Sequence, residues 1–319
     1  MRKAALLYNP ASGGSRQRQR ELEAAVAVLR SGGVEAEVFP THSREHADEE
    51  ARRAVSAGCD TVFACGGDGT IHNIAQALAT MPVALGILPM GTANALAHDL
   101  GIPRRVSAAA KSALTSELRR IALGRITCVG LKGLPTTCYF VVAAGVGVDA
   151  HLFYKLQSGV KQRLGMAAYY AKAWHLWFTY PMTRFRVELT DSESGAARNV
   201  NLTELLAVRI RHFGGVLQEL APGASLERGD MRLVMCHTES RLAYLSYVTR
   251  ALFHRRWTIP GIELAHSGKV KIDYAASSGA ERERWSKVYV EADGELLGTL
   301  PAEITMTPDA LTILAPVRR

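Results

Sequence analysis

The sequence lacks several features that mark whole classes of protein. No apolar run approaches the ~18 residues that a membrane-spanning helix needs, and the apolar start at 4–8 breaks at Asn9-Pro10, too early for a signal peptide. The five cysteines are odd in number and show no metal-ligand spacing. No dense basic run, internal repeat or low-complexity linker is present. These absences argue against a membrane-spanning protein, a zinc module and a nucleic-acid binder, and favour free thiols in the cytoplasm.

What is present indicates a large globular protein with an anionic partner. The 319 residues are too many for one compact core and fit two domains, and 48% of them are hydrophobic. The formal net charge of +8 favours a nucleotide or a membrane surface as partner, because the basic residues are scattered.

The first third of the chain alternates strands with amphipathic helices. We expect strands at 4–8, 34–39, 60–65 and 83–88, and helices at 15–31, 46–57, 71–78 and 94–100, with Ser43 as a cap of the second helix. This alternation predicts an α/β domain with a parallel sheet covered on both faces. Ligands of such sheets bind at the carboxyl ends of the strands.

The pattern changes after about Gly124. Short alternating strands are expected at 126–129, 138–144, 184–189, 201–210, 231–236, 269–274, 287–291 and 302–307, with helices at 165–178 and 241–253. Such a series predicts an antiparallel β-sandwich or barrel.

The most informative stretch is Cys65-Gly66-Gly67-Asp68-Gly69-Thr70, between an expected strand and an expected helix. Glycines there let backbone N–H groups approach phosphate oxygens at a helix N-terminus. Asp68 would repel phosphate unless it holds a metal ion or accepts a proton, so the loop indicates phosphoryl chemistry. The simpler interpretation is a structural turn with Asp68 as a helix cap.

Other polar turns follow expected strands, and each also has an ordinary interpretation. Asn9 to Gly14 and Pro89 to Asn94 end the first and fourth strands, where simple strand–helix turns also fit. Asp293-Gly294-Glu295 reads alone as a hairpin turn. Aromatic residues at 174–178 follow the basic residues Lys155, Lys161, Arg163 and Lys172, and a similar cluster lies at 250–257. Such mixtures suit a lipid headgroup boundary or a core helix with a basic edge.

Four motifs, in order, resemble the diacylglycerol kinase catalytic domain, whose family includes bacterial lipid kinases and the sphingosine and ceramide kinases. They are Asn9-Pro10-x-Ser12-Gly13, Gly66-Gly67-Asp68-Gly69-Thr70, Pro89-x-Gly91-Thr92-x-Asn94 and Asp293-Gly294-Glu295, and the glycine-containing stretches at 143–150 and 221–224 also look similar. NAD kinases and phosphofructokinases share the glycine–Asp loop. The third and fourth motifs point to the lipid branch.

The resemblance implies an ATP-binding α/β domain at 1–124, joined by the C-terminal 303–319, and a β-sandwich lipid-substrate domain at 125–302. It implies ATP contacts from Asn9, Pro10, Ser12, Gly13, Gly14, Thr41, Gly66, Gly67, Asp68, Gly69, Thr70, Thr92 and Asn94. It places Asp293 and Glu295 at the reacting hydroxyl, with Asp68 as a third catalytic candidate and a ligand of the Mg²⁺ that accompanies ATP. We therefore expect the turns of Asp68 and Asp293 to converge on one triphosphate pocket.

The sequence departs from the family where bacterial members typically hold a structural magnesium. Arg228-Gly229 stands in place of their Asp-Gly, and Ala122 in place of a supporting Asp, so the site near Ser225, Arg228 and Asp230 is expected to be lost. Our hypothesis is that Arg228 supplies a fixed positive charge there. Where some members carry Lys, this chain has Gly14, whose phosphate contact would fall to Arg16 or Arg18.

The expected function is ATP-dependent phosphorylation of a lipid hydroxyl, diacylglycerol-like first, with phosphatidylglycerol, a sphingoid base and ceramide left open. The lipid would be reached by peripheral contact with the inner face of the membrane, from the cytoplasm. An NAD kinase-type enzyme with a soluble substrate and a catalytically silent nucleotide or lipid sensor are the alternatives. Nucleic acid is not an expected partner, and a homodimer stays open.

Overall fold

The computed structural model describes residues 1–10, 16–147, 182–213, 219–252, 258–275 and 287–317. The chain divides into two compact units, the first made of Met1–Leu123, His212–Gln218 and Thr307–Arg319, the second of Gly124–Arg211 and Glu219–Met306. The sequence gives no sign that 212–218 belongs with the first unit.

The first unit is built on a parallel sheet. Its strands are β1 (Lys3–Tyr8), β2 (Glu35–Pro40), β3 (Thr61–Gly66), β4 (Ala84–Pro89) and the end of β15 (Glu295–Ala315). Their order is β15-β4-β3-β1-β2, and every pair is parallel. All residues of β3 and β4 are buried, as expected for central strands covered on both faces.

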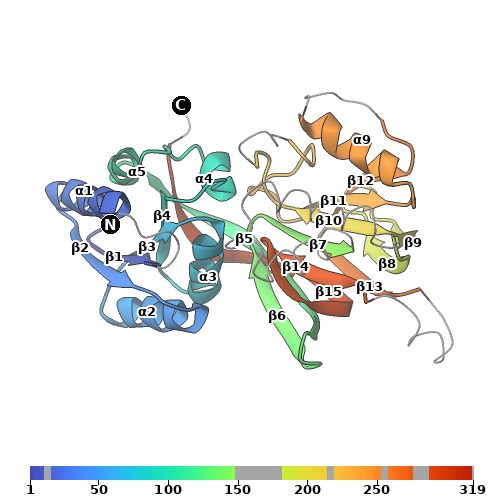
Figure 1. The fold of residues 1–319 in the computed structure, drawn as a ribbon, viewed down its shortest axis with the longest axis horizontal. Coiled ribbons are helices and arrows are strands. Elements are labelled where there is room, and N and C mark those ends of the chain that lie inside the picture. Colours follow the sequence, from blue (N-terminus) through green and yellow to red (C-terminus); the bar gives the residue numbers. More distant parts are fainter. Residues whose placement is uncertain (11–15, 148–181, 214–218, 253–257, 276–286, 318–319) are drawn as a thin grey trace. The chain divides into compact units, whose positions relative to one another are not determined.

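Helices cover this sheet on two sides, with α1 and α5 on one and α2 and α3 on the other (Figure 1). They are α1 (Arg16–Ser31), α2 (Arg44–Ser56), α3 (Asp68–Leu78), α4 (Ala95–Asp99) and α5 (Val106–Ala113). Buried Leu22, Ala25, Val26 and Leu29 form one apolar face of α1. The predicted cap of α2 is confirmed, because the Ser43 hydroxyl accepts a hydrogen bond from the His46 N–H at 3.1 Å.

The second unit is antiparallel. Its strands are the second half of β5 (Glu117–Gly130), β6 (Pro135–Phe140), β7 (Ala143–Gly147), β8 (Phe185–Thr190), β9 (Ala197–Leu202), β10 (Glu204–Val208), β11 (Met231–Cys236), β12 (Ile262–Ser267), β13 (Lys269–Tyr274), β14 (Tyr289–Ala292) and most of β15, with the helix α9 (Arg241–Leu252). One run has the order β12-β11-β10-β7-β14-β15, and β13, β8 and β9 continue from β15. Alternate residues of both runs fill a single apolar core.

The predicted fold class is confirmed: a parallel α/β unit and a β-sandwich unit. The strand predicted at 201–210 is two strands, because Thr203 leaves the ladder and its hydroxyl donates to the carbonyls of Cys236 and Thr238. The sequence prediction missed α5 and β12. The helix expected at 165–178 and the aromatic–basic stretches at 174–178 and 254–257 lie outside the described residues.

Candidate active site

Asp68 is the first residue of α3 and joins two loops of the first unit. Its carboxylate accepts hydrogen bonds from the N–H groups of Asn94 (3.0 Å) and Ala95 (2.7 Å), which open α4. The residue therefore caps α4 and not its own helix, whose N-cap is Gly67. This bridge holds the loop after β3 against the loop after β4.

The two loops touch through their glycines. A Cβ on Gly91 would lie 2.4 Å from the Cα of Gly67, so a side chain there would force the loops apart. Asn94, in the left-handed region with φ 51°, folds its side chain back: its Nδ2 donates to the Gly91 carbonyl and its Oδ1 accepts from the Gly91 N–H. The amide of Asn94 thus shapes the loop from within.

A cavity of about 280 Å³ opens beside these loops at the carboxyl ends of the strands. Its lining residues come from β1 and the turn after it, from the first turns of α1, and from the ends of β3 and β4: Tyr8, Asn9, Pro10, Arg16, Arg18, Gln19, Leu22, Cys65, Gly66 and Met90. Burial raises the pKa of the Cys65 thiol well above its usual range, so this side chain is uncharged. The basic side chains on the wall are those of Arg16 and Arg18, where the sequence predicted a phosphate contact.

The other residues predicted to contact ATP have different surroundings. Thr41 is buried, and its hydroxyl donates to the Tyr8 carbonyl at 3.2 Å. Thr70 packs against Gly66, where a Cβ would meet its Oγ1 at 2.3 Å. Thr92 is exposed, in the loop after β4. Ser12, Gly13 and Gly14 lie outside the described residues.

In the second unit Asp293 occupies the tight turn between β14 and β15. Its φ of 49° and the Gly294 φ of 84° are both left-handed, as in a hairpin turn. The carboxylate accepts three backbone N–H groups, from Val141 (3.0 Å), Val142 (2.8 Å) and Ala143 (3.1 Å). Asp293 therefore anchors the turn to the start of β7.

Glu295 follows as the first residue of β15, with a half-buried side chain. The buried Glu291, which the sequence analysis missed, accepts the Gly294 N–H at 2.7 Å and lies over Gly145 of β7. A pair of glycines in the predicted stretch 143–150 was the available signal, because glycines in a strand leave room for a neighbouring group.

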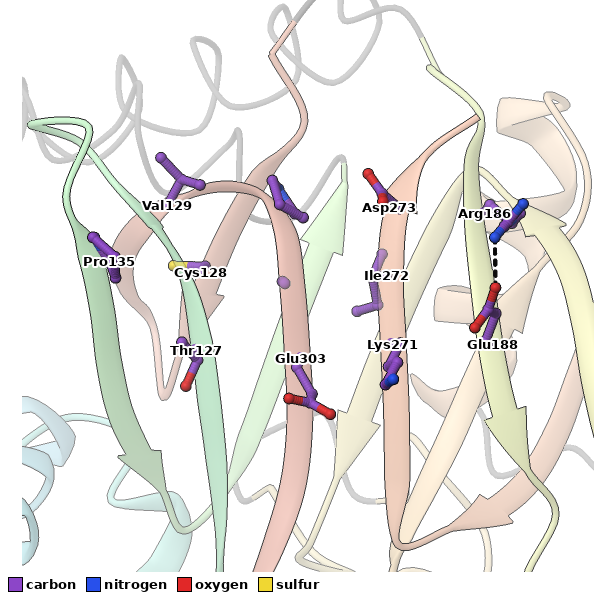
Figure 2. Close-up of a pocket in the computed structure, with 12 residues that line it drawn as sticks. Thr127, Cys128, Val129, Pro135, Arg186, Glu188, Lys271, Ile272, Asp273 and Glu303 are labelled. Carbon is purple, nitrogen blue, oxygen red and sulfur yellow. Dashed lines mark hydrogen bonds and ion pairs between the residues drawn. The ribbon is translucent and has the colours of Figure 1, made fainter. Parts of the chain in front are cut away.

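A groove of about 490 Å³ crosses the exposed face of the sheet in the second unit (Figure 2). Lys271 of β13 lies opposite both Glu303 of β15 and Glu188 of β8 in the strand register. Arg186 donates to Glu188 at 2.5 Å. Cross-strand pairs of opposite charge stabilise a sheet. This groove therefore combines a row of charged side chains with apolar residues such as Val129, Pro135 and Pro301.

The residues at 225–230, where the resemblance gives other members a structural magnesium, do not fit a metal ion. Arg228 donates twice to the Asp230 carboxylate, at 2.6 and 2.8 Å. Burial opposes ionisation of Asp230, but Arg228 outweighs it and holds the pKa of that carboxyl below its usual value. The loop carbonyls instead bind Arg209, which the sequence analysis missed. Arg209 lies two and four positions after the buried Ala207 and Leu205, and this alternation could have predicted that it faces the core.

Among the described residues, no cluster of three or more His, Cys, Asp or Glu side chains is placed to hold a metal ion. In the same part of the chain, no helix is both long and apolar enough to cross a membrane.

Two family models cover most of the chain. Residues 3–126 match the diacylglycerol kinase catalytic domain, and residues 141–315 match the YegS C-terminal NAD kinase beta sandwich-like domain. A diacylglycerol kinase of Bacillus subtilis (strain 168) is 27% identical over 306 residues, which are 95% of this chain and 93% of that protein. One from Staphylococcus aureus (strain MRSA252) is 25% identical over 317 residues, 99% of this chain and 93% of that protein.

Solved structures show the same fold. A diacylglycerol kinase structure from Bacillus anthracis str. Sterne superposes with a TM-score of 0.69 at 16% identity, covering 98% of this chain and 96% of that one. Yeast NADH kinase complexed with NADH gives a TM-score of 0.51 at 9% identity, covering 99% of this chain and 84% of that one.

These matches show the class of enzyme to which the chain belongs: a phosphotransferase with an alcohol acceptor, of the lipid-kinase type. This chain belongs to the diacylglycerol kinase catalytic-domain family.

Proposed function

We propose that this protein transfers the γ-phosphoryl group of ATP to the hydroxyl of a diacylglycerol-like lipid. The observation that carries the proposal is the cavity in the first unit, which lies at the carboxyl ends of β1, β3 and β4 and has Arg16 and Arg18 on its wall. Anions bind at this edge of parallel α/β sheets because helix N-termini and backbone N–H groups face them there.

In this proposal the glycine loop and the two arginines bind the triphosphate of MgATP, the substrate form in which magnesium arrives. Phosphoryl transfer depends on positioning and charge neutralisation. Asp68 is a positioning residue, because both of its carboxylate oxygens bind the backbone at the start of α4. Its charge is thus compensated by N–H dipoles beside the phosphates.

We assign the general base to Glu295. A base must reach the reacting hydroxyl, at about 3 Å, with a free lone pair. The carboxylate of Asp293 already accepts three backbone N–H groups, which hold it against the start of β7. Asp293 would hold the turn, and Glu295 would take the proton.

A transfer assay with γ-labelled ATP tests the function. Mixed micelles containing diacylglycerol, phosphatidylglycerol, a sphingoid base or ceramide are compared with NAD as a soluble acceptor. The expected result is label in a chloroform-extractable product, with diacylglycerol the best acceptor. Label only in the aqueous phase would establish the NAD kinase-type alternative, and ATP binding without turnover on any acceptor would establish a sensor.

The role of Glu295 is tested in the same assay. Glu295→Gln keeps the size of the side chain and removes the base, so turnover should fall at least ~100-fold with an unchanged melting temperature. Asp293→Asn should instead lower the melting temperature, because an amide cannot accept all three N–H groups on one oxygen. Lost turnover with an unchanged melting temperature in Asp293→Asn, and a lowered melting temperature in Glu295→Gln, would instead assign the general base to Asp293.

A further inference from the structure

Arg209 directly follows β10 and is completely buried within the second unit. Its Nη1 donates to the carbonyl oxygens of Arg228 at 2.7 Å and Asp230 at 2.5 Å, and its Nη2 to that of Leu226 at 3.3 Å. One guanidinium thus binds three backbone carbonyls of a single loop, residues 226–230.

Convergence of carbonyl oxygens on one point is the arrangement that a bound cation requires. Burial lowers the pKa of Arg209 to about 10, against the favourable charge of Asp230, so the side chain stays protonated at neutral pH. An uncompensated buried charge is strongly unfavourable. Here the carbonyl dipoles compensate it, and the charge in turn holds the loop.

We propose that Arg209 is a built-in structural cation, which holds the 226–230 loop in the role that the family resemblance gives to magnesium. A divalent ion would need the carbonyl lone pairs that Arg209 already uses. Of the two carboxylates in the loop, that of Asp230 is paired with Arg228, and Glu227 is exposed. Two guanidinium groups at short range would also repel a divalent ion. The second unit therefore needs no metal to fold.

One consequence rests on the proposed function: magnesium would then serve phosphoryl transfer only as the partner of ATP. Its concentration dependence should follow formation of MgATP, with no second requirement.

The first test uses the unaltered protein and does not depend on an activity measurement. Thermal unfolding is followed in a chelator and in about 10 mM Mg²⁺, Mn²⁺ or Ca²⁺. A ligand that binds only the folded state raises the melting temperature through the term RT ln(1 + [L]/Kd). We expect the melting temperature to be the same in all conditions. A rise of several degrees with a divalent ion would overturn the proposal. A larger rise in the Arg228→Ala variant would locate the ion at this loop.

The second test removes the cation. Arg209→Ala leaves three buried carbonyls without their donor and should lower the melting temperature by roughly 10 °C. Free guanidinium at low millimolar concentration should restore part of that loss, whereas urea should not. The direction is diagnostic, since guanidinium otherwise destabilises proteins.

Arg228→Ala is the matched control, because its guanidinium lies in the same loop but binds only the Asp230 side chain among the described contacts. Guanidinium should not stabilise this variant. Arg209→Lys, which keeps the charge and three donors, should fall between the parent and Arg209→Ala. If Arg209→Ala fails to fold, rescue is sought in Arg209→Lys. Equal rescue of the Arg209 and Arg228 variants would refute a specific site.

A second, independent observation concerns the tip of the β5–β6 hairpin. Leu131 and Leu134 are 59% and 68% exposed there, on either side of the exposed Lys132, in a turn that Gly133 makes with φ 80°. The whole hairpin, 124–140, contains no acidic residue. Exposed apolar side chains beside a basic one are suited to the boundary of an anionic membrane.

We infer that this tip inserts into a lipid surface, which would give the enzyme access to its lipid. The double variant Leu131→Asp/Leu134→Asp should lower partitioning onto phosphatidylglycerol-containing vesicles at least ~10-fold. Leu242→Asp, at a residue 70% exposed on α9, is the control and should partition normally. Equal partitioning of the tip variant and the parent, or no binding by the parent, would overturn the inference. Phosphorylation of a water-soluble short-chain diacylglycerol reports the proposed function separately, and the tip variant should retain it.

Discussion

Two loops of this molecule use their backbones in opposite ways. In the first unit the loop at 66–70 ends a parallel strand in glycines, and the N–H groups at the start of α3 belong to a helix N-terminus that attracts an anion. In the second unit the loop at 226–230 turns its carbonyls inward, onto the buried Arg209. Under the proposed function the first loop is completed by a ligand, whereas the second is completed by the chain itself.

The comparison separates two roles for charged side chains near functional loops. Asp68 and Arg209 each bind backbone groups of a distant segment, and each neutralises dipoles that would otherwise be unmet. Asp68 joins the two loops whose residues Gly66 and Met90 line the cavity, so under the proposed function it should affect ligand binding, whereas Arg209 is enclosed and should affect stability. Variants of the first loop should therefore change activity, and variants of the second loop should change stability.

The largest effect is expected at Asp68. Asp68→Ala releases the start of α4 and should lower kcat/KM for ATP at least ~100-fold, because small displacements of positioning groups are that costly. Asp68→Asn retains one acceptor oxygen for Asn94 or Ala95 and should lose clearly less. A general base or direct metal ligand would be lost equally in both variants, so equal kinetics of the two would contradict the positioning role.

The next effect is expected at the glycine contact between the loops. Gly91→Ala places a Cβ 2.4 Å from the Cα of Gly67, so the loops must separate. ATP affinity should fall roughly tenfold or more, measured by equilibrium binding. Gly229→Ala, in the loop of the second unit, is the control, since nothing lies within 4 Å of its Cβ position. Unchanged ATP affinity in Gly91→Ala would show that the approach is not needed for binding.

Sequence patterns were sufficient for the fold class because strands and helices have strong periods. The buried strands β3 and β4 and the capped α2 lie within a few residues of their predicted places. α5 was missed because its eight residues are too few for a pattern to establish a helix, and β12 because burial does not alternate along it. The division of 201–210 at Thr203 depends on a hydroxyl that bonds to residues more than 30 positions away, which no local pattern reveals.

The same limit applies to the site. Motifs located the glycine loops and the Asp293 turn, but they did not say what each carboxylate binds. Asp68 bonds to Asn94 and Ala95, and Asp293 to residues about 150 positions earlier in the chain. Sequence placed the fixed positive charge of the second unit on Arg228, whereas the carbonyl cluster holds Arg209. Only the folded backbone shows which guanidinium reaches it.

The smallest effect concerns the pH dependence of the second unit, beside the Arg209 loop. His266 is 3% exposed, and burial first, then Arg232 and Arg228, lowers its pKa, while Asp230 and Glu193 act in the opposite direction. The imidazole is thus neutral in the folded state. In the unfolded state its pKa is about 6.5, so acidification below that value protonates the unfolded chain first and lowers stability.

His266→Gln should therefore flatten the loss of stability between about pH 7 and pH 5, by up to about 1.4 kcal/mol for each unit by which the folded pKa is lowered. The measurement is the urea unfolding free energy of the parent and the variant across that range, with His42→Gln, at an exposed residue of the first unit, as the control for removing an imidazole. If the unfolding free energy of His266→Gln fell with pH as steeply as that of the parent, protonation of His266 would not be the cause of the loss. This part of the second unit would then tolerate a further positive charge. The Arg209 cluster would then be less tightly balanced than the contacts around it imply.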